Sequence, residues 1–191
     1  EQNMALIAAG MSFAGKIPFI SSYSVFSPGR NNEQIRTNIA YANANVKIAG
    51  SHAGVTVGQD GATHQALEDV GLMRMLPNMS VVVACDAEEA KKATVAVSKI
   101  SGPVYLRFFR NKTPVITTAN TPFKIGQAEV FKEGKDVVIF ACGPMVYNSL
   151  LAAMELEKER ISVAVVNVHT IKPLDKDMIL KYANNTRAVV T

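Results

Sequence analysis

A carboxylate and an imidazole lie close together in a glycine-rich segment of this sequence, GQDGATHQ. Asp60 and His64 are four residues apart, and Gly58 and Gly61 allow backbone conformations that other residues resist. An acid and a histidine that point into one cleft can hydrogen-bond hydroxyl groups or shuttle a proton. The same letters also fit a helix start, with Thr63 as the cap of a helix that opens at His64. The two interpretations are compatible.

Further candidates lie at the ends of predicted strands. His52 ends NVKIAGSH, and Tyr23 and Phe26 end PFISSYSVF. Ligands of open αβ sheets bind off the carboxyl ends of the strands, and two aromatic rings there could form an apolar wall for a flat ligand. Arg110 follows VYLRFF, and its fork of donors suits a phosphate or a carboxylate. Each also has a structural interpretation, as a core side chain or a surface charge.

Other charged residues have simpler explanations. Glu1 opens EQNM directly before an apolar helical pattern, where the positive end of a helix favours an acid. Arg107 lies inside a predicted buried strand and therefore needs a partner. Arg30 and Arg36 follow Phe26, and we expect them to be solvated or paired.

Helical and strand patterns alternate over the first part of the chain. We expect helices at 1–15, 30–42, from 64 onward and at 87–100, the last capped by Asp86, and strands at 17–24, 45–50, 79–86 and 104–109. Regular alternation of this kind predicts an α/β fold, with a mostly parallel sheet and helices on both faces.

The character of the sequence changes at residues 111–122, NKTPVITTANTP, which we interpret as a linker. A hairpin is expected at 124–143 with Gly134 at its turn, followed by a helix at 145–158, a strand at 161–170, a helix capped by Asp175 and a closing strand. The predicted domains are therefore 1–110 and a second, partial α/β domain at 123–191. Both ends fall inside expected elements, so we expect a fragment.

Composition excludes several classes of protein. Hydrophobic residues make up 48% and charged residues 19% of the 191 residues, which is typical of a globular protein with an apolar core. Basic and acidic residues, 20 against 16, are interspersed, so we expect no nucleic-acid partner. No apolar stretch approaches the ~20 residues that span a bilayer. Cys85 and Cys142 show no metal-ligand spacing, and we expect buried, reduced thiols in a cytoplasmic protein and no metal ligands in this chain.

A family resemblance runs through the chain. The segments EQNMALIAAGMSFAG, YSVFSPGR, SHAGVTVGQDGATHQALED, LMRMLPNMSVVVACDAEEA, GKDVVIFACGPMV and HTIKPLD resemble, in this order, the thiamine-diphosphate-dependent transketolase family. They are most similar to the C-terminal section of split transketolases. The resemblance implies a pyrimidine-binding domain, part of the C-terminal domain, and transfer of a two-carbon ketol unit between sugar phosphates. It also implies a cytoplasmic dimer of the pentose phosphate pathway.

The resemblance also implies roles for particular residues. Glu1 would hydrogen-bond N1′ of the aminopyrimidine and so activate the cofactor, while Phe26, with Tyr23, would pack on the pyrimidine ring. The implied contacts to the sugar phosphate and its hydroxyls are His52, Asp60, His64 and Arg110, of which His64 would also be catalytic.

The sequence departs from the family pattern in two ways. Gly29 and Asn32 stand where fused transketolases carry further aromatic residues, and there is no GDG motif followed by an asparagine to hold a diphosphate and its metal. The resemblance therefore implies that Mg²⁺ or Ca²⁺ is bound by a missing diphosphate-binding domain or by a partner chain, the N-terminal section. Because the family's cofactor lies between subunits, we expect a homo-oligomer, and an isolated fragment that is inactive and binds no cofactor at micromolar levels.

Several alternatives remain open at this stage. A 1-deoxyxylulose-5-phosphate synthase shares the DGxTHQ element, although His52 in SHAG favours transketolase; DGATHQ is not the pattern of a pyruvate dehydrogenase beta subunit. A non-catalytic subunit that only completes a partner's fold is a second class. A Rossmann-like binding module is a third, against which the missing GxGxxG argues.

Overall fold

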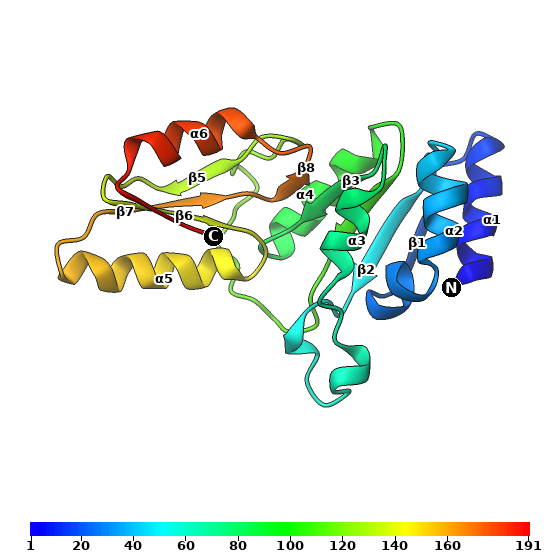
Figure 1. Cartoon of the computed structure of the whole chain (residues 1–191), viewed down its shortest axis with the longest axis horizontal. Helices are drawn as coiled ribbons and strands as arrows, with labels where there is room; N and C mark the ends of the chain where they lie inside the picture. The colour runs from blue at the N-terminus through cyan, green and yellow to red at the C-terminus, as the bar shows by residue number, and fades with distance from the viewer. The chain divides into compact units, whose positions relative to one another are not determined.

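The computed structural model describes residues 1–191, and the chain divides into two compact units. The first unit comprises residues 1–82 and 93–112, and the second comprises residues 83–92 and 113–191. Figure 1 traces the chain through both units. The ten residues from 83 to 92 thus belong with segments that follow them much later in the sequence. The domain limits at 110 and 123 that we drew along the sequence stay predictions.

A parallel sheet forms the centre of the first unit. Its strands β1 (Phe19–Tyr23), β2 (Lys47–Ser51), β4 (Val104–Arg107) and β3 (Ser80–Val83) lie in this order. β2 runs parallel to β1 on one side and to β4 on the other. Side chains on both faces of the central strands are buried, which is typical of a parallel sheet covered by helices. The predicted α/β fold with a mostly parallel sheet is confirmed.

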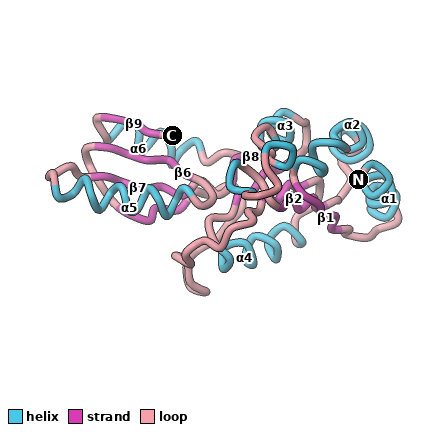
Figure 2. Tube along the Cα trace, turned by 90° about the horizontal axis from the view of Figure 1, so that it is seen from below, coloured by secondary structure: helices cyan, strands magenta, loops and turns pink.

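Helices surround this sheet. They are α1 (Gln2–Phe13), α2 (Asn32–Gln34), α3 (Asp69–Met75) and α4 (Ala87–Ser98), with wide helical turns at η1 (Val25–Arg30) and η2 (Ile35–Tyr41). Figures 1 and 2 both show α1 beside α2. Helix α1 is apolar around its circumference but buries only alanines, so that Leu6, Ile7 and Met11 remain 44–56% exposed. This helix therefore presents an uncovered apolar face.

The helix predicted to start at His64 is wrong, because α3 begins at Asp69. Residues Ala62–His64 form one turn of 3₁₀ helix, η4, and η3 (Val55–Val57) is another. Gln65 is extended, with φ −81° and ψ 104°, which ends the turn before a second one can form. Its neighbour Ala66 instead forms a bridge to Ala53. The Thr63 hydroxyl consequently caps no helix and donates to the Asp60 carbonyl at 3.4 Å.

The second unit contains a mixed sheet of strands β5 (Glu129–Lys132), β7 (Val163–Asn167), β6 (Val137–Ala141) and β9 (Ala188–Val190), in this order. The predicted hairpin is wrong, because β7 lies between β5 and β6 and pairs with both. Every residue of β7 is buried, and a strand without a polar face is favoured at the centre of a sheet. Gly134 lies against the Val163 backbone, where a Cβ atom would collide.

Two long helices cover the two faces of this sheet, α5 (Met145–Lys158) and α6 (Lys176–Asn185), as Figure 1 shows. Alternate residues of β7 point to opposite faces: Val163 and Val165 pack in the cluster that contains α5, and Ala164 and Val166 in the cluster that contains Tyr182 of α6. The short strand β8 (Thr170–Lys172) precedes α6. The predicted caps are confirmed: Asp175 accepts from Met178 N at 3.0 Å, and Asp86 accepts from Glu89 N at 2.8 Å.

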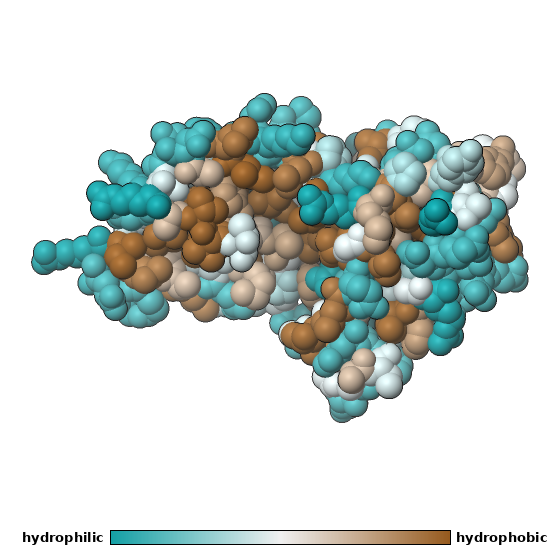
Figure 3. All heavy atoms as spheres, viewed as in Figure 1, coloured by the Kyte–Doolittle hydropathy of each residue, from teal (hydrophilic) through white to brown (hydrophobic).

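The surface is mixed in hydropathy (Figure 3), and the two cysteines are free thiols. Hydrophilic and hydrophobic residues are interspersed on the face that Figure 3 shows. Cys85 is buried as predicted, Cys142 is only half-buried, and neither forms a disulfide. Burial raises the pKa of the Cys85 thiol, and the nearby Glu89 carboxyl raises it further. A helix with the length and apolarity needed to cross a bilayer does not occur in the structure.

Candidate functional site

A stacked pair of rings lies where β1 and β2 end. Tyr23 is the last residue of β1 and pairs with Ser51, so His52 follows directly on the neighbouring strand. The Tyr23 and His52 rings are 3.9 Å apart between centroids and 13° from parallel. His52 has a φ of 56°, a left-handed conformation that is uncommon outside glycine and that often occurs at functional sites. The stacked pair therefore rests on a backbone held in a costly conformation.

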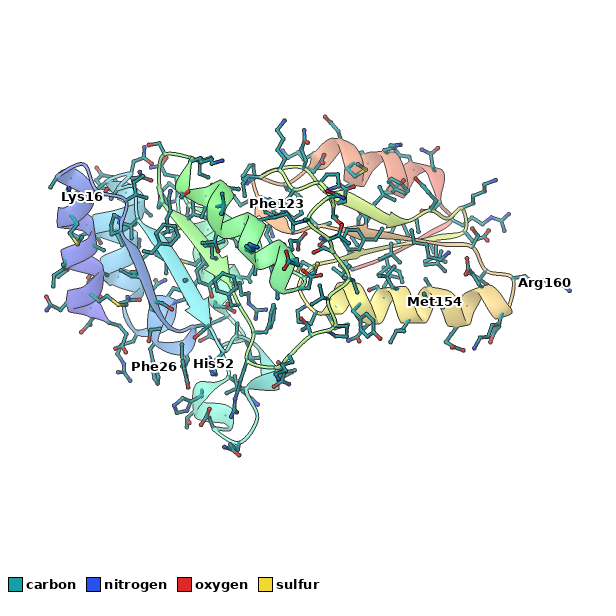
Figure 4. The ribbon with its side chains drawn as sticks, turned by 180° about the vertical axis from the view of Figure 1, so that it is seen from behind. Lys16, Phe26, His52, Phe123, Met154 and Arg160 are labelled. Atoms are coloured by element: carbon teal, nitrogen blue, oxygen red, sulfur yellow. The ribbon has the colours of Figure 1, made fainter.

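Phe26 and His64 extend this pair into a cluster of rings. The Phe26 ring lies nearly parallel to Tyr23 at 6.2 Å, and His64 meets Phe26 edge-on at 5.3 Å and Tyr23 edge-on at 6.0 Å. Figure 4 shows Phe26 and His52 at the same edge of the first unit. All four side chains are half-buried, so part of each ring remains accessible. We call Tyr23, Phe26, His52 and His64 the ring cluster.

An ion pair connects Glu1 to the ring cluster. The Arg30 guanidinium lies 4.7 Å from the centre of the Phe26 ring, and its Nη1 lies 3.4 Å from Glu1 Oε2. The Glu1 carbonyl accepts from Ala5 N as α1 begins, and also from Asn31 Nδ2 at 3.2 Å. The opening carboxylate is therefore fixed beside the aromatic face by the segment that carries Phe26. Sequence analysis expected Arg30 to be solvated or paired, and missed that its partner would be Glu1.

Asp60 and Arg110 meet at the glycine-rich loop. Arg110 Nη1 lies 3.7 Å from Asp60 Oδ2 and also donates to the Val57 carbonyl. A Cβ atom at Gly58 would stand only 2.9 Å from this nitrogen, so the glycine lets the guanidinium reach the loop. Each of the two charged side chains is about one third exposed. Both charges are therefore open to a ligand from solvent.

Contacts thus link all the predicted site residues along one edge of the first unit. The Thr63 hydroxyl joins the two halves, because it donates to the Asp60 carbonyl and lies 2.8 Å from His64 Nδ1. These linked residues could hold a flat ring beside the Glu1 carboxylate. Next to that ring they could bind an anion that carries hydroxyl groups. No three His, Cys, Asp or Glu side chains gather in an arrangement that could hold a metal ion.

A second, buried group lies beneath the ring cluster, and sequence analysis found only one of its members. Arg107, expected to need a partner, donates through Nε to Asp69 at 2.7 Å. Asp69 also accepts from Tyr105 Oη at 2.6 Å, and the Ser24 hydroxyl lies 3.0 Å from the same phenol oxygen. The charge inside a predicted strand was the sole sequence signal for this group.

Comparison with protein families identifies the chain. The family described as "Transketolase, pyrimidine binding domain" matches residues 1–115, and "Transketolase, C-terminal domain" matches residues 126–191. The chain belongs to the transketolase family. This confirms the resemblance drawn from the sequence motifs, including the order of the two domains.

Relatives of this transketolase chain include subunits of split enzymes. It is 42% identical over its whole length to "6-deoxy-6-sulfo-D-fructose transketolase subunit SqwH" of a Clostridium species, and covers 59% of that protein. It is 42% identical over 183 residues to "Putative transketolase C-terminal section" of Methanocaldococcus jannaschii, and covers 58% of that protein. A solved structure described as "Split gene transketolase, inactive beta4 tetramer" is 45% identical, with a TM-score of 0.92, over 99% of this chain and 61% of that one. The chain therefore spans about three fifths of the length of these relatives.

Proposed function

We propose that this chain supplies the pyrimidine-binding side of a thiamine diphosphate site in a split transketolase, which transfers a two-carbon ketol unit between sugar phosphates. The observation that supports the proposal most is the link from the Glu1 carboxylate through Arg30 to the Phe26 ring, 3.4 Å and 4.7 Å long. A carboxyl group beside an aromatic face is the arrangement that an aminopyrimidine requires.

The residues present fit this half of the cofactor. The Glu1 side chain is 24% exposed and Arg30 is 59% exposed, and an exposed ion pair contributes little free energy. A ring nitrogen can therefore replace Arg30 on the Glu1 carboxylate at little cost. The half-buried Phe26 ring offers an apolar surface for a flat heterocycle.

Thiamine diphosphate, when bound, would supply a carbon nucleophile for the ketose carbonyl. Glu1 contributes by holding a proton at N1′ of the pyrimidine, and Phe26 with Tyr23 orients that ring. His64 and Asp60 hydrogen-bond the donor hydroxyls, and His64 moves a proton at the reacting oxygen. His52 and Arg110 bind the terminal anion of the sugar.

The terminal anion defines the substrate class. Arg110 is one third exposed, and both its 3.7 Å ion pair with Asp60 and its bond to the Val57 carbonyl use Nη1, so its other donors are available to a tetrahedral anion. A phosphate and a sulfonate share this chemistry, and one relative is named for a sulfo-fructose. We favour a ketose phosphate, and the assay below includes the sulfonate as a separate donor.

The site also requires other polypeptides. We propose that the N-terminal, diphosphate-binding section carries the Mg²⁺ or Ca²⁺ and the diphosphate, and that the complete enzyme is an oligomer. The related split-gene transketolase, described as an inactive beta4 tetramer, supports the oligomer, and the relatives described as a subunit and a C-terminal section support a further section. Leu6, Ile7 and Met11 on α1 form an exposed apolar face on the helix that Glu1 opens. We propose that another subunit covers this face.

Donor consumption tests the reaction. The full protein is mixed with its diphosphate-binding section, thiamine diphosphate and Mg²⁺, and is supplied in turn with xylulose 5-phosphate, fructose 6-phosphate, 6-deoxy-6-sulfofructose and pyruvate, each with an aldose acceptor. We expect consumption of a phosphorylated ketose. Consumption of pyruvate alone would instead support the alternative, a 1-deoxyxylulose-5-phosphate synthase-like enzyme.

A substitution tests the role of Glu1. Glu1→Gln should lower kcat by roughly 10²-fold or more, the usual contribution of a group that positions a proton in the transition state. Glu155→Gln, on the exposed side of α5 with a side chain 71% exposed, is the matched control and should leave kcat unchanged. If Glu1→Gln keeps full turnover, the chain is a non-catalytic subunit that only completes its partner, and the proposal fails.

A further inference from the structure

A buried carboxylate, a phenol and a guanidinium form one hydrogen-bonded group beneath the ring cluster. Asp69 accepts from Tyr105 Oη at 2.6 Å, from Arg107 Nε at 2.7 Å and from Arg107 Nη2 at 3.2 Å. The Asp69 side chain is 1% exposed, and Tyr105 is completely buried. Neither the carboxylate nor the phenol therefore has the access to solvent that direct binding of the cofactor or the sugar requires.

The proton positions in this group follow from counting donors. A phenol has one proton, and the 2.6 Å distance to the Asp69 carboxylate assigns it to that bond. Burial raises the pKa of Tyr105 well above its ordinary value, and the Asp69 charge raises it further, so the phenol keeps its proton. Ser24 Oγ lies 3.0 Å from both Tyr105 Oη and the Ser51 carbonyl oxygen. That carbonyl has two lone pairs and accepts from Ser24 N at 2.8 Å as well as from Ser24 Oγ, so the single Ser24 hydroxyl proton can serve either this carbonyl or the phenol oxygen.

This chain of bonds connects the segments that carry the ring cluster. Ser24 stands between Tyr23 and Phe26, and Ser51 precedes His52. Asp69 opens α3, which follows the loop of His64. The phenol thus contacts Ser24, which is next to Tyr23, and Asp69, which lies five residues after His64, and it reaches Ser51 next to His52 only through Ser24.

Gly50 makes room for the phenol under β2. A Cβ atom at this position would stand 2.5 Å from Tyr105 Oη and 2.7 Å from Ser24 Oγ. Side-chain atoms do not approach so closely, so any larger residue would push the phenol away from Ser24. A glycine at position 50 is therefore needed for the contact between Ser24 and Tyr105.

We propose that Tyr105 and Asp69 are positioning residues, which fix the spacing and orientation of Tyr23, His52 and His64 from below. They act through Ser24 and through the start of α3, and touch neither substrate nor cofactor. The hydrogen bonds described above support the positioning role, whereas the effect of positioning on turnover depends on the proposed function. The left-handed backbone of His52, with a φ of 56°, is the feature that such support must hold in place.

Histidine signals provide a test that needs no activity. The chain has three histidines, of which His169 lies in the second unit, stacked on Phe123 at 4.3 Å. The His52 ring C–H signals are shifted by the Tyr23 ring current, since the two rings are 3.9 Å apart. In Tyr105→Phe we expect the His52 and His64 signals of a ¹H–¹³C spectrum to move and the His169 signals to stay. In the control Tyr182→Phe, which removes a phenol bonded to Glu133 at 2.8 Å, the His52 and His64 signals should stay in place.

Ser24→Ala serves as the second variant if Tyr105→Phe does not fold, because it removes the contact with the phenol, together with the contact to the Ser51 carbonyl, and leaves the Asp69 bonds intact. It should move the His52 signal in the same direction. Unmoved His52 and His64 signals in a folded Tyr105→Phe chain, or in Ser24→Ala if only that variant folds, would overturn the proposal.

Turnover provides the second measurement. With the diphosphate-binding section present, Tyr105→Phe should lower kcat by roughly 10- to 100-fold through misplacement of the rings, with KM for the ketose changed little, and Tyr182→Phe should keep wild-type kcat. A wild-type complex that consumes no ketose would refute the proposed function, while the histidine signals would still decide the positioning role. Shifted signals with an unchanged kcat would overturn the catalytic consequence of the positioning.

Discussion

The Asp86 carboxylate accepts four hydrogen bonds inside the second unit. Oδ1 accepts from Glu89 N and from the Thr117 hydroxyl, both at 2.8 Å. Oδ2 accepts from Ile116 N at 2.7 Å and from Thr117 N at 2.6 Å. The residue is 5% exposed. A single side chain thus caps α4 and attaches the segment around Thr117 to it.

Asp86→Asn changes this arrangement with almost no change in shape. The new amide nitrogen must replace one of the two oxygens, and each oxygen faces two donors. In place of Oδ2, the amide leaves two backbone N–H groups without an acceptor; in place of Oδ1, it leaves the Glu89 N–H group unpaired and forces the Thr117 hydroxyl to turn. The second orientation costs less, because one bond is lost outright and the other three lose only the charge of their acceptor. At roughly 1.5–3 kcal/mol for a bond to a charged group and roughly 0.5–1.5 kcal/mol for a neutral bond, the free energy of unfolding falls by roughly 4.5–7.5 kcal/mol.

Asp175→Asn is a matched control in the same unit. Asp175 caps α6, and its oxygens accept one bond each, from Met178 N at 3.0 Å and from Ala128 N at 2.8 Å. An asparagine keeps one of these two bonds as a weaker, neutral one, so the expected loss is roughly 2.5–4.5 kcal/mol. Asp175 is half-buried and each of its oxygens faces one donor, whereas Asp86 is buried and each of its oxygens faces two.

Denaturant unfolding of both variants at neutral pH measures these losses, and hydrogen exchange locates them. We expect the Ile116 and Thr117 amides to lose protection in Asp86→Asn and to keep it in Asp175→Asn. If Asp86→Asn costs no more than Asp175→Asn, or if both amides stay protected, the reasoning from bond counting is wrong.

Acid should remove the same contribution from the wild type. Burial alone would raise the pKa of Asp86, but the hydrogen bonds that its carboxylate accepts outweigh burial and hold that pKa below its ordinary value. A carboxyl whose pKa is lowered on folding stabilises the protein fully above its unfolded pKa, and the stabilisation is lost as pH falls through the folded pKa. The difference in stability between wild type and Asp86→Asn should therefore shrink in acid.

Two further predictions concern other parts of the chain. Burial raises the pKa of Glu89, and the Asp86 charge adds to this, so the stability that Glu89 contributes below its unfolded pKa is lost as pH rises through its folded pKa. Glu89→Gln, in which the amide can bond the unpaired Asn167 Oδ1, should remove this loss when the free energy of unfolding is measured against pH. If the variant and the wild type lose the same free energy of unfolding over that pH range, the assignment is wrong. Ile7→Lys on the exposed face of α1 should reduce the mass of the assembly in sedimentation without changing the free energy of unfolding, and an unchanged mass would show that α1 is not a subunit contact.

Local rules predicted much of this structure because they depend on neighbours in the sequence. Helix α5 matches its expected range, 145–158, and both aspartate caps form as expected, since a cap needs only an acid before the first helical turn. The motif resemblance also depends on sequence alone, and both family matches confirm it. At His64 the sequence fitted both a glycine-rich loop and a helix start. The extended backbone of Gln65 ends the turn there, so the helix does not form.

Pairing between distant segments was beyond the reach of the sequence. The order β5-β7-β6 replaced the expected hairpin, because the fully buried β7 gains more from the centre of the sheet than β5 and β6 gain from pairing with each other. The hydrophobic pattern of a strand shows that it is buried, but not which strand lies beside it.

The sequence by itself determined which residues could do chemistry: the types and spacing of Glu1, Phe26, Asp60 and His64 are visible without coordinates, and so is the need of Arg107 for a partner. Only the tertiary structure decided that Arg30 joins Glu1 to Phe26, and that Asp69 and Tyr105 lie beneath the rings. Apart from the contact of Arg30 with Phe26, these contacts join residues 29 to 81 positions apart. Their energies depend on distance in space and on exclusion of water, which the order of residues does not encode.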